Sequence, residues 1–220
     1  MQSVVSKITT KIRRMKNQGT ILEFLTFFRR ASQLKANPRF GTSLPEYGDT
    51  VAEHSWRLAL MVYLIGTEFK VGVDLNRAMA IALFHDLAEA KTGDIDAYEV
   101  IQKRVSVEDK HANEAAAMDE MTNDLSFGHR VHDLWTEYLK QETIEARFVK
   151  ALDKIEAFLH IDEQGVEGYK PKEFHSNYAD EAVQRFDEAA SHFPELSDLL
   201  EMVKKDLKVK FQEKGIEWKE

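Results

Sequence analysis

The chain has 220 residues, of which 43% are hydrophobic, so it can bury a substantial core, and its length does not require a second domain. Its 30 basic and 38 acidic residues give a net charge of −8, which argues against binding to a nucleic-acid backbone. Because the chain contains no cysteine, disulfides, thiolate zinc sites and cysteine nucleophiles are excluded, and His and carboxylates would have to hold any metal ion. No membrane-spanning apolar run or signal-peptide pattern is present, so we expect a cytoplasmic protein.

Apolar residues recur at helical spacing along the chain, and the alternation typical of strands is absent. With only 4 prolines and 10 glycines, the sequence predicts an all-α fold, which we interpret as one domain over residues 1–220. Residues 1–17 carry five basic side chains and no acid, and their apolar side chains share one helical face. This pattern predicts an amphipathic first helix that packs on the body of the protein or on a partner subunit; a targeting or anion-binding arm is the alternative.

A second helix is predicted from Ile21 to about Leu34, with Leu22, Leu25 and either Phe28 or Arg29 along its stripe. The loop that begins at Asn37-Pro38 ends this helix, because the residue before a proline disfavours the helical conformation.

The next helix begins with a recognisable signal. The run Thr50-Val51-Ala52-Glu53 fits a capping box, in which the hydroxyl and the carboxylate satisfy free backbone N–H groups at a helix start. His54 therefore lies in a first helical turn, one turn before Leu58 on the same face. The apolar stripe of this helix is predicted to be Leu58, Met61, Val62, Ile65 and Phe69.

A further helix is predicted from about Leu75 to Ala90. Its segment Ala78–Phe84 is continuously apolar, so we expect it to be buried on all sides. His85, Asp86 and Glu89 then follow where the core pattern predicts no polar group. An ionised aspartate in such surroundings costs several kcal/mol unless a partner or a metal ion compensates its charge.

Two interpretations of this cluster are open. Asp86 could pair with a core Arg or Lys while His85 is an ordinary buried histidine. The coincidence of the doublet with Glu89 and with Glu53-His54 on an earlier helix favours a metal site. His and carboxylate ligands suit manganese, cobalt, iron, zinc or magnesium and do not choose among them.

The remainder of the chain predicts helix after helix with short connections. The predicted elements are a polar helix over about 107–122, helices over 127–139 and 144–163, and two helices on either side of Pro194.

The placement of these residues resembles a known family. Glu53-His54, His85-Asp86 and Asp153 on three helices resemble the H…HD…D signature of the HD-domain metal-dependent phosphohydrolases. The run His85–Ile95, HDLAEAKTGDI, resembles the HD-x-x-E-x-x-x-GD-I string of the 5′-deoxynucleotidase branch of that family. The resemblance covers roughly residues 20–200, nearly the whole chain.

The resemblance implies a helical bundle around one central divalent cation, usually in a homodimer. The implied metal ligands are His54, His85, Asp86 and Asp153. Only the resemblance nominates Asp153, because its position on the flank of an apolar stripe would otherwise favour a surface pair with Lys150 or Lys154.

The resemblance also implies the working residues around the metal. Glu89 and Asp94 match the family's further acids, and a carboxylate near a metal can orient water or move a proton. Asp94 follows Gly93, which we expect to end the helix, so its alternative role is an ordinary cap. Arg39 corresponds to the family's arginine before the first metal-binding helix and could clamp a phosphate. Related enzymes carry a tryptophan close to this arginine, where the present chain has Phe40, so the family's substrate selectivity is not carried over.

Other candidates have simpler interpretations. A solvated helix face or a structural role is favoured for four histidines: His111, His129, His132 and His160. Core packing rather than base stacking is favoured for three aromatic residues: Trp135, Tyr138 and Phe148.

The resemblance therefore implies a hydrolase that removes phosphate from a (deoxy)nucleoside 5′-monophosphate. We expect a small nucleotide as its partner, and neither nucleic acid nor membrane. Glu89 would orient or deprotonate the attacking water, Asp94 would assist at the leaving oxygen, and Arg39 would hold the phosphate. The alternatives are an HD-type phosphodiesterase, a nucleoside-triphosphate hydrolase, and a non-catalytic helical binding protein stabilised by its metal.

Overall fold

The computed structural model describes residues 18–39, 49–95, 104–164, 175–215 and 218, which excludes the predicted helix over residues 1–17 and Phe40. The described residues form helices and no strand, apart from one isolated bridge between Pro38 and Thr50, so the predicted all-α class is confirmed. None of the helices in these ranges is long and apolar enough to cross a membrane. After a helix over residues 18–31, the elements are η1 (Ser32–Lys35), α2 (Val51–Glu68), α3 (Leu75–Phe84), α4 (Glu89–Thr92), α6 (Val107–Thr122), α7 (Gly128–Lys140), α8 (Ile144–Gln164), α10 (His175–His192), η3 (Pro194–Leu196) and α11 (Ser197–Glu213).

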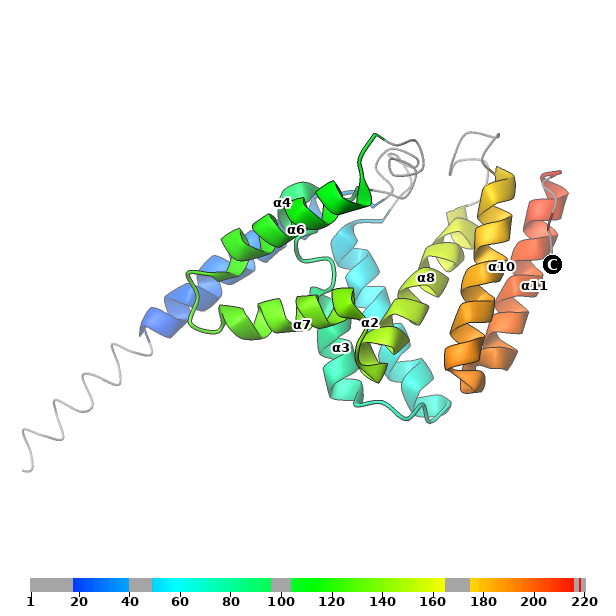
Figure 1. Ribbon diagram of the computed structural model, residues 1–220, viewed down its shortest axis with the longest axis horizontal. Coiled ribbons are helices and arrows are strands. Elements are labelled where there is room, and N and C mark those ends of the chain that lie inside the picture. The colour runs from blue at the N-terminus through cyan, green and yellow to red at the C-terminus, as the bar shows by residue number, and fades with distance from the viewer. Residues whose placement is uncertain (1–17, 40–48, 96–103, 165–174, 216–217, 219–220) are drawn as a thin grey trace, which may run out of the picture.

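The helices enclose two hydrophobic cores. The first, here the C-terminal core, lies among α2, α3, α8, α10 and α11, and its fully buried side chains include Leu58, Ile81 and Phe148. The second, the N-terminal core, lies among the helix over 18–31, α6 and α7 and includes Phe27 and Met118. Figure 1 shows α10 and α11 on one side of the molecule and the helix over 18–31 with α4 and α6 on the other. Since α3 contributes to the C-terminal core and α4 follows Leu87 and Ala88 of the N-terminal core, the segment between α3 and α4 joins the two.

The later helices confirm the predicted order. The helix α6 covers Val107–Thr122 as predicted, α7 and α8 begin and end within one residue of their predicted limits, and α10 and α11 flank Pro194. A Ser106 hydroxyl that accepts from the Asp109 N–H at 3.0 Å starts α6, in the manner of an N-cap.

The predicted apolar stripe of the first described helix is wrong. The helix occupies residues 18–31 and tightens into η1, but Leu22 is 61% exposed and Leu25 45% exposed, and Phe28 is exposed too. Phe27 is buried instead, where its ring meets the edge of Phe127 at a centroid distance of 5.6 Å. The run contains apolar residues on more than one face, so its periodicity alone does not select the buried face.

The predicted helix from Leu75 to Ala90 is also wrong, because α3 ends at Phe84 and α4 begins only at Glu89. Between them, the backbone forms turns closed by bonds from Leu87 N–H to Phe84 O and from Glu89 N–H to Asp86 O. Ala78–Phe84 is not buried on all sides either, since Leu83 is 51% exposed. The helix breaks where the chain passes from one core to the other.

Candidate metal centre

His54 is positioned by the start of α2. Thr50 and Glu53 form the predicted capping box: the Thr50 N–H donates to Glu53 Oε2 at 2.7 Å, and the Glu53 N–H donates to Thr50 Oγ1 at 3.2 Å. The imidazole of His54 is completely buried, with its Nδ1 2.6 Å from Glu156 Oε2 on α8. Because a carboxylate only accepts hydrogen bonds, Nδ1 carries the proton and Nε2 of the neutral ring carries the lone pair.

His85 is the first residue after α3. Its Nδ1 lies 2.8 Å from the backbone oxygen of Ala82, a group that only accepts, so Nδ1 again carries the proton. This contact also explains why the helix stops, since in a continued helix the Ala82 carbonyl would accept the N–H of Asp86. The doublet thereby leaves the helical geometry, and Asp86 Oδ2 comes to lie 2.9 Å from Nε2 of its own neighbour His85.

Asp153 lies on α8 and is not the surface residue that its periodicity suggests. It is buried, and its Oδ1 lies 3.4 Å from His54 Nε2 and 3.9 Å from His85 Nε2. Its other oxygen, Oδ2, accepts the hydroxyl of Tyr138 at 2.7 Å and lies 3.6 Å from Lys150 Nζ.

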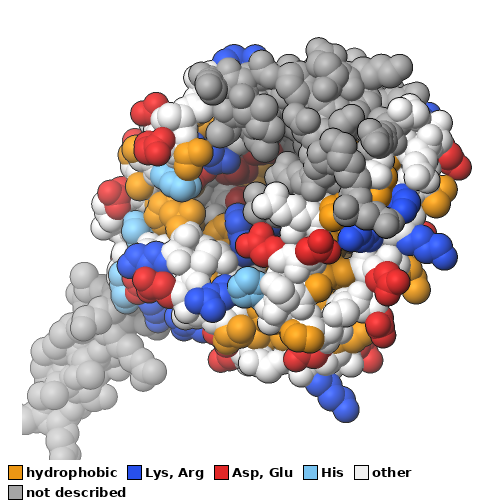
Figure 2. All heavy atoms as spheres, turned by 45° about the vertical axis from the view of Figure 1, so that its right-hand side comes forward, with side chains coloured by type: hydrophobic (Ala, Val, Ile, Leu, Met, Phe, Trp, Pro, Cys, Tyr) orange, Lys and Arg blue, Asp and Glu red, His pale blue; other side chains and the backbone are white. Residues whose placement is uncertain are grey.

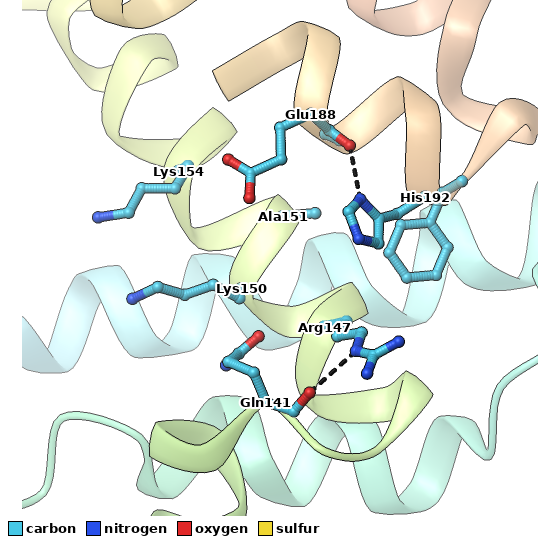
Figure 3. Close-up of a pocket in the computed structure, with 9 residues that line it drawn as sticks. Gln141, Arg147, Lys150, Ala151, Lys154, Glu188 and His192 are labelled. Carbon is cyan, nitrogen blue, oxygen red and sulfur yellow. Dashed lines mark hydrogen bonds between the residues drawn. The ribbon is translucent and has the colours of Figure 1, made fainter. Parts of the chain in front are cut away.

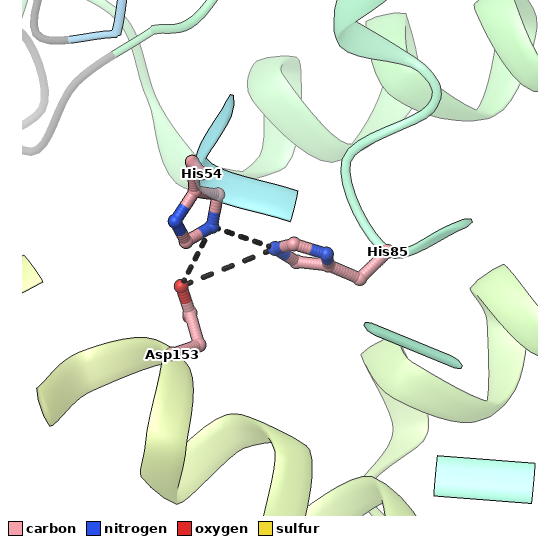
Figure 4. Close-up of side chains that lie close together, drawn as sticks. All are labelled: His54, His85 and Asp153. Carbon is pink, nitrogen blue, oxygen red and sulfur yellow. Dashed lines mark hydrogen bonds and ion pairs between the residues drawn. The ribbon is translucent and has the colours of Figure 1, made fainter. Parts of the chain in front are cut away.

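The structure therefore brings together the four side chains that the sequence nominates as metal ligands. Figure 4 shows three of them, His54, His85 and Asp153, pointing toward one another from separate elements, and their ligand atoms all lie within 4.8 Å of one another. Asp86 Oδ2 completes the group at 3.5 Å from His54 Nε2. Ligand atoms that each lie about 2.1 Å from one cation are about 3.0–3.5 Å apart at neighbouring coordination positions, so the spacing fits a single ion.

The two histidines supply a second argument for a cation. Their Nε2 atoms face each other at 3.1 Å, although both Nδ1 atoms donate to acceptors on the far sides of the rings. Two neutral rings in these tautomers would direct lone pairs at each other, which is unfavourable in a buried site unless a positive charge lies between them. Burial and Arg39 oppose protonation of His54, but hydrogen bonds with Asp153 and Glu156 outweigh them and raise the pKa of His54 to about 9. Either a proton or a metal ion can supply the positive charge.

Charged side chains around His54 form a network that holds its imidazole in place. Glu156 is completely buried and accepts from His54 Nδ1, from Arg57 Nε at 2.6 Å and from Arg39 Nη1. Burial alone would raise the pKa of Glu156, but the charge of Arg39 and the hydrogen bond with His54 lower it to about 2. Arg39, predicted from the sequence as a phosphate clamp, thus contacts Glu156, and its Nη2 lies 3.8 Å from Asp153 Oδ1.

Two further acidic residues lie near the cluster, Glu89 and Asp94. Glu89 is buried, and its pKa is raised well above the usual range by burial and by the charges of Asp86 and Asp94. Gly93, at φ +70°, ends α4 as predicted, and Asp94 follows it outside the helix. Lys110 on α6 is a nearby cation that opposes the rise in the pKa of Glu89, and its Nζ lies 2.8 Å from the backbone oxygen of Ile95.

The remaining sequence candidates lie outside the cluster. His160 is buried and its Nδ1 lies 3.5 Å from Asp49 Oδ1, while His111 and His129 are exposed and His132 lies 3.7 Å from Asp119. The three aromatic residues assigned to the core are buried as predicted: Trp135, Tyr138 and Phe148.

Three residues that touch the cluster were not identified from the sequence as part of it: Glu156, Tyr138 and Lys150. A signal existed for Glu156, since it interrupts an apolar stripe three residues after Asp153, on the same side of the helix. Tyr138 gives no such signal, because a tyrosine in an apolar stripe is ordinarily core, and here the ring is buried while only the hydroxyl reaches Asp153.

Comparison with known proteins identifies the family. A family model described as HD domain matches residues 31–195. The chain belongs to the HD-domain family. Among curated relatives, 5′-deoxynucleotidase HDDC2 of Xenopus laevis is 40% identical over 61% of this chain and 66% of its own length. The Homo sapiens protein of the same name is 36% identical over 67% of this chain and 71% of its own, and that of Danio rerio is 32% identical over 83% and 86%.

Solved structures share the fold. A predicted metal-dependent phosphohydrolase from Magnetospirillum magnetotacticum superposes with a TM-score of 0.70 at 23% identity, covering 87% of this chain and 96% of that one. A conserved hypothetical protein from Pyrococcus furiosus superposes with a TM-score of 0.62 at 26% identity, covering 82% and 99%. The helical arrangement described above is therefore that of HD-domain proteins.

Proposed function

We propose that this HD-domain protein is a metal-dependent phosphohydrolase that removes phosphate from (deoxy)nucleoside 5′-monophosphates. The names of the curated relatives, 5′-deoxynucleotidases, support the substrate class. The observation that carries the proposal is the pair of inward-facing imidazole nitrogens at 3.1 Å, flanked by two carboxylates, because this donor set requires a positive charge at its centre.

In this proposal His54, His85, Asp86 and Asp153 hold one divalent cation. His and carboxylate donors are compatible with cobalt, manganese, iron, zinc or magnesium. A bound divalent ion would lower the pKa of a water molecule and polarise a phosphoryl oxygen.

The surrounding side chains would orient the reactants. Glu89 would orient or deprotonate the attacking water, and Asp94 would assist at the leaving 5′-oxygen. Arg39 would stabilise the phosphate, since its guanidinium lies 3.8 Å from Asp153 Oδ1 and a phosphate at the cluster would come within its reach. Phe40 lies outside the described residues, so its contact with the substrate stays a prediction.

Three broader features belong to the same proposal: a single domain that spans the chain, a homodimeric assembly and a cytoplasmic location. The single domain and the cytoplasmic location are expectations from the sequence, and the homodimer is what the family resemblance implies. Sedimentation of the purified protein would test the assembly.

The decisive experiment combines a substrate panel with one ligand variant. The purified protein is assayed for phosphate release from nucleoside monophosphates with each candidate ion, and Asp86→Ala is expected to abolish release while the helical circular dichroism spectrum is preserved. Asp133→Ala, which removes an exposed acid on α7, should retain full activity. Activity retained by Asp86→Ala would refute the assignment. Cleavage confined to cyclic or triphosphate substrates would favour the phosphodiesterase or triphosphatase alternative. A melting temperature sensitive to chelators without any turnover would indicate a binding protein.

A further inference from the structure

Lys150 lies on α8, one turn before Asp153, and reaches to the edge of the metal cluster. Its Nζ donates to the hydroxyl of Tyr138 at 2.8 Å and lies 3.6 Å from Asp153 Oδ2. It also lies 4.6 Å from the centroid of the Tyr138 ring. The ammonium group of Lys150 therefore lies next to Oδ2 of Asp153, a proposed metal ligand.

The cluster is more exposed to solvent at Lys150 and Asp86 than at its two histidines. The side chain of Lys150 is 40% exposed and that of Asp86 is 23% exposed, whereas those of His54 and His85 are at most 1% exposed. Figure 2 shows a hollow on one face of the molecule with acidic side chains inside it and Lys or Arg side chains next to it. A ligand that approaches the cluster from solvent would pass on the side of Asp86 and Lys150.

Lys150 also differs from the other cations around the site in what it contacts. Arg39 and Arg57 both contact the buried carboxylate of Glu156. Lys110 donates to a backbone oxygen and lies 3.7 Å from Glu114 on its own helix. The hydrogen bond of Lys150, in contrast, goes to a neutral phenol, and its carboxylate neighbour is beyond ordinary hydrogen-bond distance.

We propose that Lys150 is a phosphate-binding residue of this site, whose ammonium group donates to an oxygen of a phosphate monoester that occupies the metal cluster. Tyr138 would continue to hold Asp153 Oδ2, so the proposed metal ligand keeps its orientation when the ammonium group turns toward the phosphate. A charge-assisted hydrogen bond to a dianion is stronger than one to a neutral hydroxyl, which favours this exchange of partner. The inference rests on the proposed function and adds a second cation, beside Arg39, that receives the substrate.

The neighbouring Lys154 provides a matched control. Figure 3 shows Lys150 and Lys154 extending to the same side of α8, where both line a groove of about 300 Å³ between α8 and α10. Lys154 is one helical turn beyond Lys150 and makes no hydrogen bond or ion pair with the residues that the structure describes. Replacing either lysine by methionine removes the same charge from the same face, but only Lys150 contacts Tyr138 and Asp153.

The test measures binding of inorganic phosphate by calorimetry at limiting and at saturating manganese, together with the KM for a nucleoside monophosphate. Lys150→Met should weaken phosphate binding and raise KM by about tenfold or more, Lys150→Arg should restore part of the loss, and Lys154→Met should stay within about twofold of the wild type. Manganese affinity is measured in parallel by competition with a chelator.

Two results would overturn the proposal: phosphate affinity of Lys150→Met within twofold of the wild type, or a deficit that disappears when manganese is saturating. The second would show that Lys150 only supports Asp153. Since the phosphate titration does not depend on turnover, an absence of nucleotidase activity would refute the proposed function and leave this measurement valid.

Discussion

Glu156 and Glu89 are both buried glutamates beside the same cluster, but the groups around them carry opposite charges. Cationic groups surround Glu156, and mainly acidic groups surround Glu89. Glu156 meets Arg39, Arg57 and the N–H of His54, and its pKa is lowered to about 2. Glu89 lies near three further carboxylates, those of Asp86, Asp94 and Glu114. Burial and these negative charges outweigh Lys110 and raise the pKa of Glu89 well above the usual range. Burial alone disfavours the charged form of both residues, so the neighbours decide which of them is ionised in the metal-free protein.

The difference separates two tasks. Glu156 and His54 are completely buried, and two arginines compensate the charge of Glu156, which suits a residue that fixes the orientation of His54. Glu89 is surrounded mainly by other acids, including the proposed metal ligand Asp86, which suits proton transfer and cation binding. The variants below test whether the two tasks can be impaired separately.

The largest effect is expected at Glu89. Glu89→Gln should lower kcat by about 100- to 10,000-fold, the range typical of a lost general acid or base, while manganese affinity changes little. Steady-state kinetics at saturating metal, with chelator competition for affinity, would measure both quantities. The exposed Glu120→Gln on α6 serves as the control. A normal kcat in Glu89→Gln would remove this residue from the chemistry.

Replacing Glu156 should impair metal binding more than the chemical step, the opposite of what is expected for Glu89. Glu156→Gln keeps an acceptor for His54 but removes the buried negative charge that Arg39 and Arg57 share, so manganese affinity should fall by about 10- to 100-fold. At saturating manganese, kcat should recover far more than in Glu89→Gln. The control is Glu163→Gln, which removes the exposed second partner of Arg57 and should leave the affinity near that of the wild type. Equal losses in both variants would contradict a positioning role for Glu156.

In the metal-free protein, the contributions of the two glutamates to stability should change in opposite directions with pH. The folded-state pKa of Glu89 is raised, so its stability contribution is full below the unfolded pKa near 4.5 and is lost as pH rises. That of Glu156 is lowered, so its contribution is present above 4.5 and is lost as pH falls toward about 2. The Tm difference between Glu89→Gln and the wild type should therefore shift in favour of the variant by about 2 °C or more from pH 4.5 to pH 7. Glu156→Gln should still have a lower Tm than the wild type at pH 7. Differential scanning calorimetry in the presence of a chelator would measure these Tm values. A Glu156→Gln variant that gains stability at pH 7, or a Glu89→Gln variant that loses it, would contradict the assignment.

The smallest effect concerns the helix start that carries His54. Thr50→Ala removes the capping box and should cost about 1 kcal/mol of the free energy of unfolding, which lowers Tm by about 2–4 °C. At saturating metal the activity should stay close to that of the wild type, because packing around α2 keeps the first turn in place. Thr67→Ala, an exposed residue near the other end of α2, is the control. A large loss of kcat in Thr50→Ala would mean that the cap positions His54 directly.

The sequence by itself determined the helical class, the limits of the later helices, the capping box at Thr50 and the run His85–Ile95 that marks the family. These features depend on residues within one or two helical turns of each other, so their signals are local. The position of His54 in a first turn follows from the same kind of signal.

Only the tertiary structure decided where α3 breaks and what surrounds the cluster. The break at His85 comes from a side chain that takes the Ala82 carbonyl at the junction of the two cores, although the local sequence is strongly helical. The contact of Glu156 with His54 joins positions 102 residues apart, and that of Arg39 with Glu156 joins positions 117 apart. Nothing in a local window encodes such pairs, because they form only when α2 and α8 pack against each other and exclude water from the charges between them.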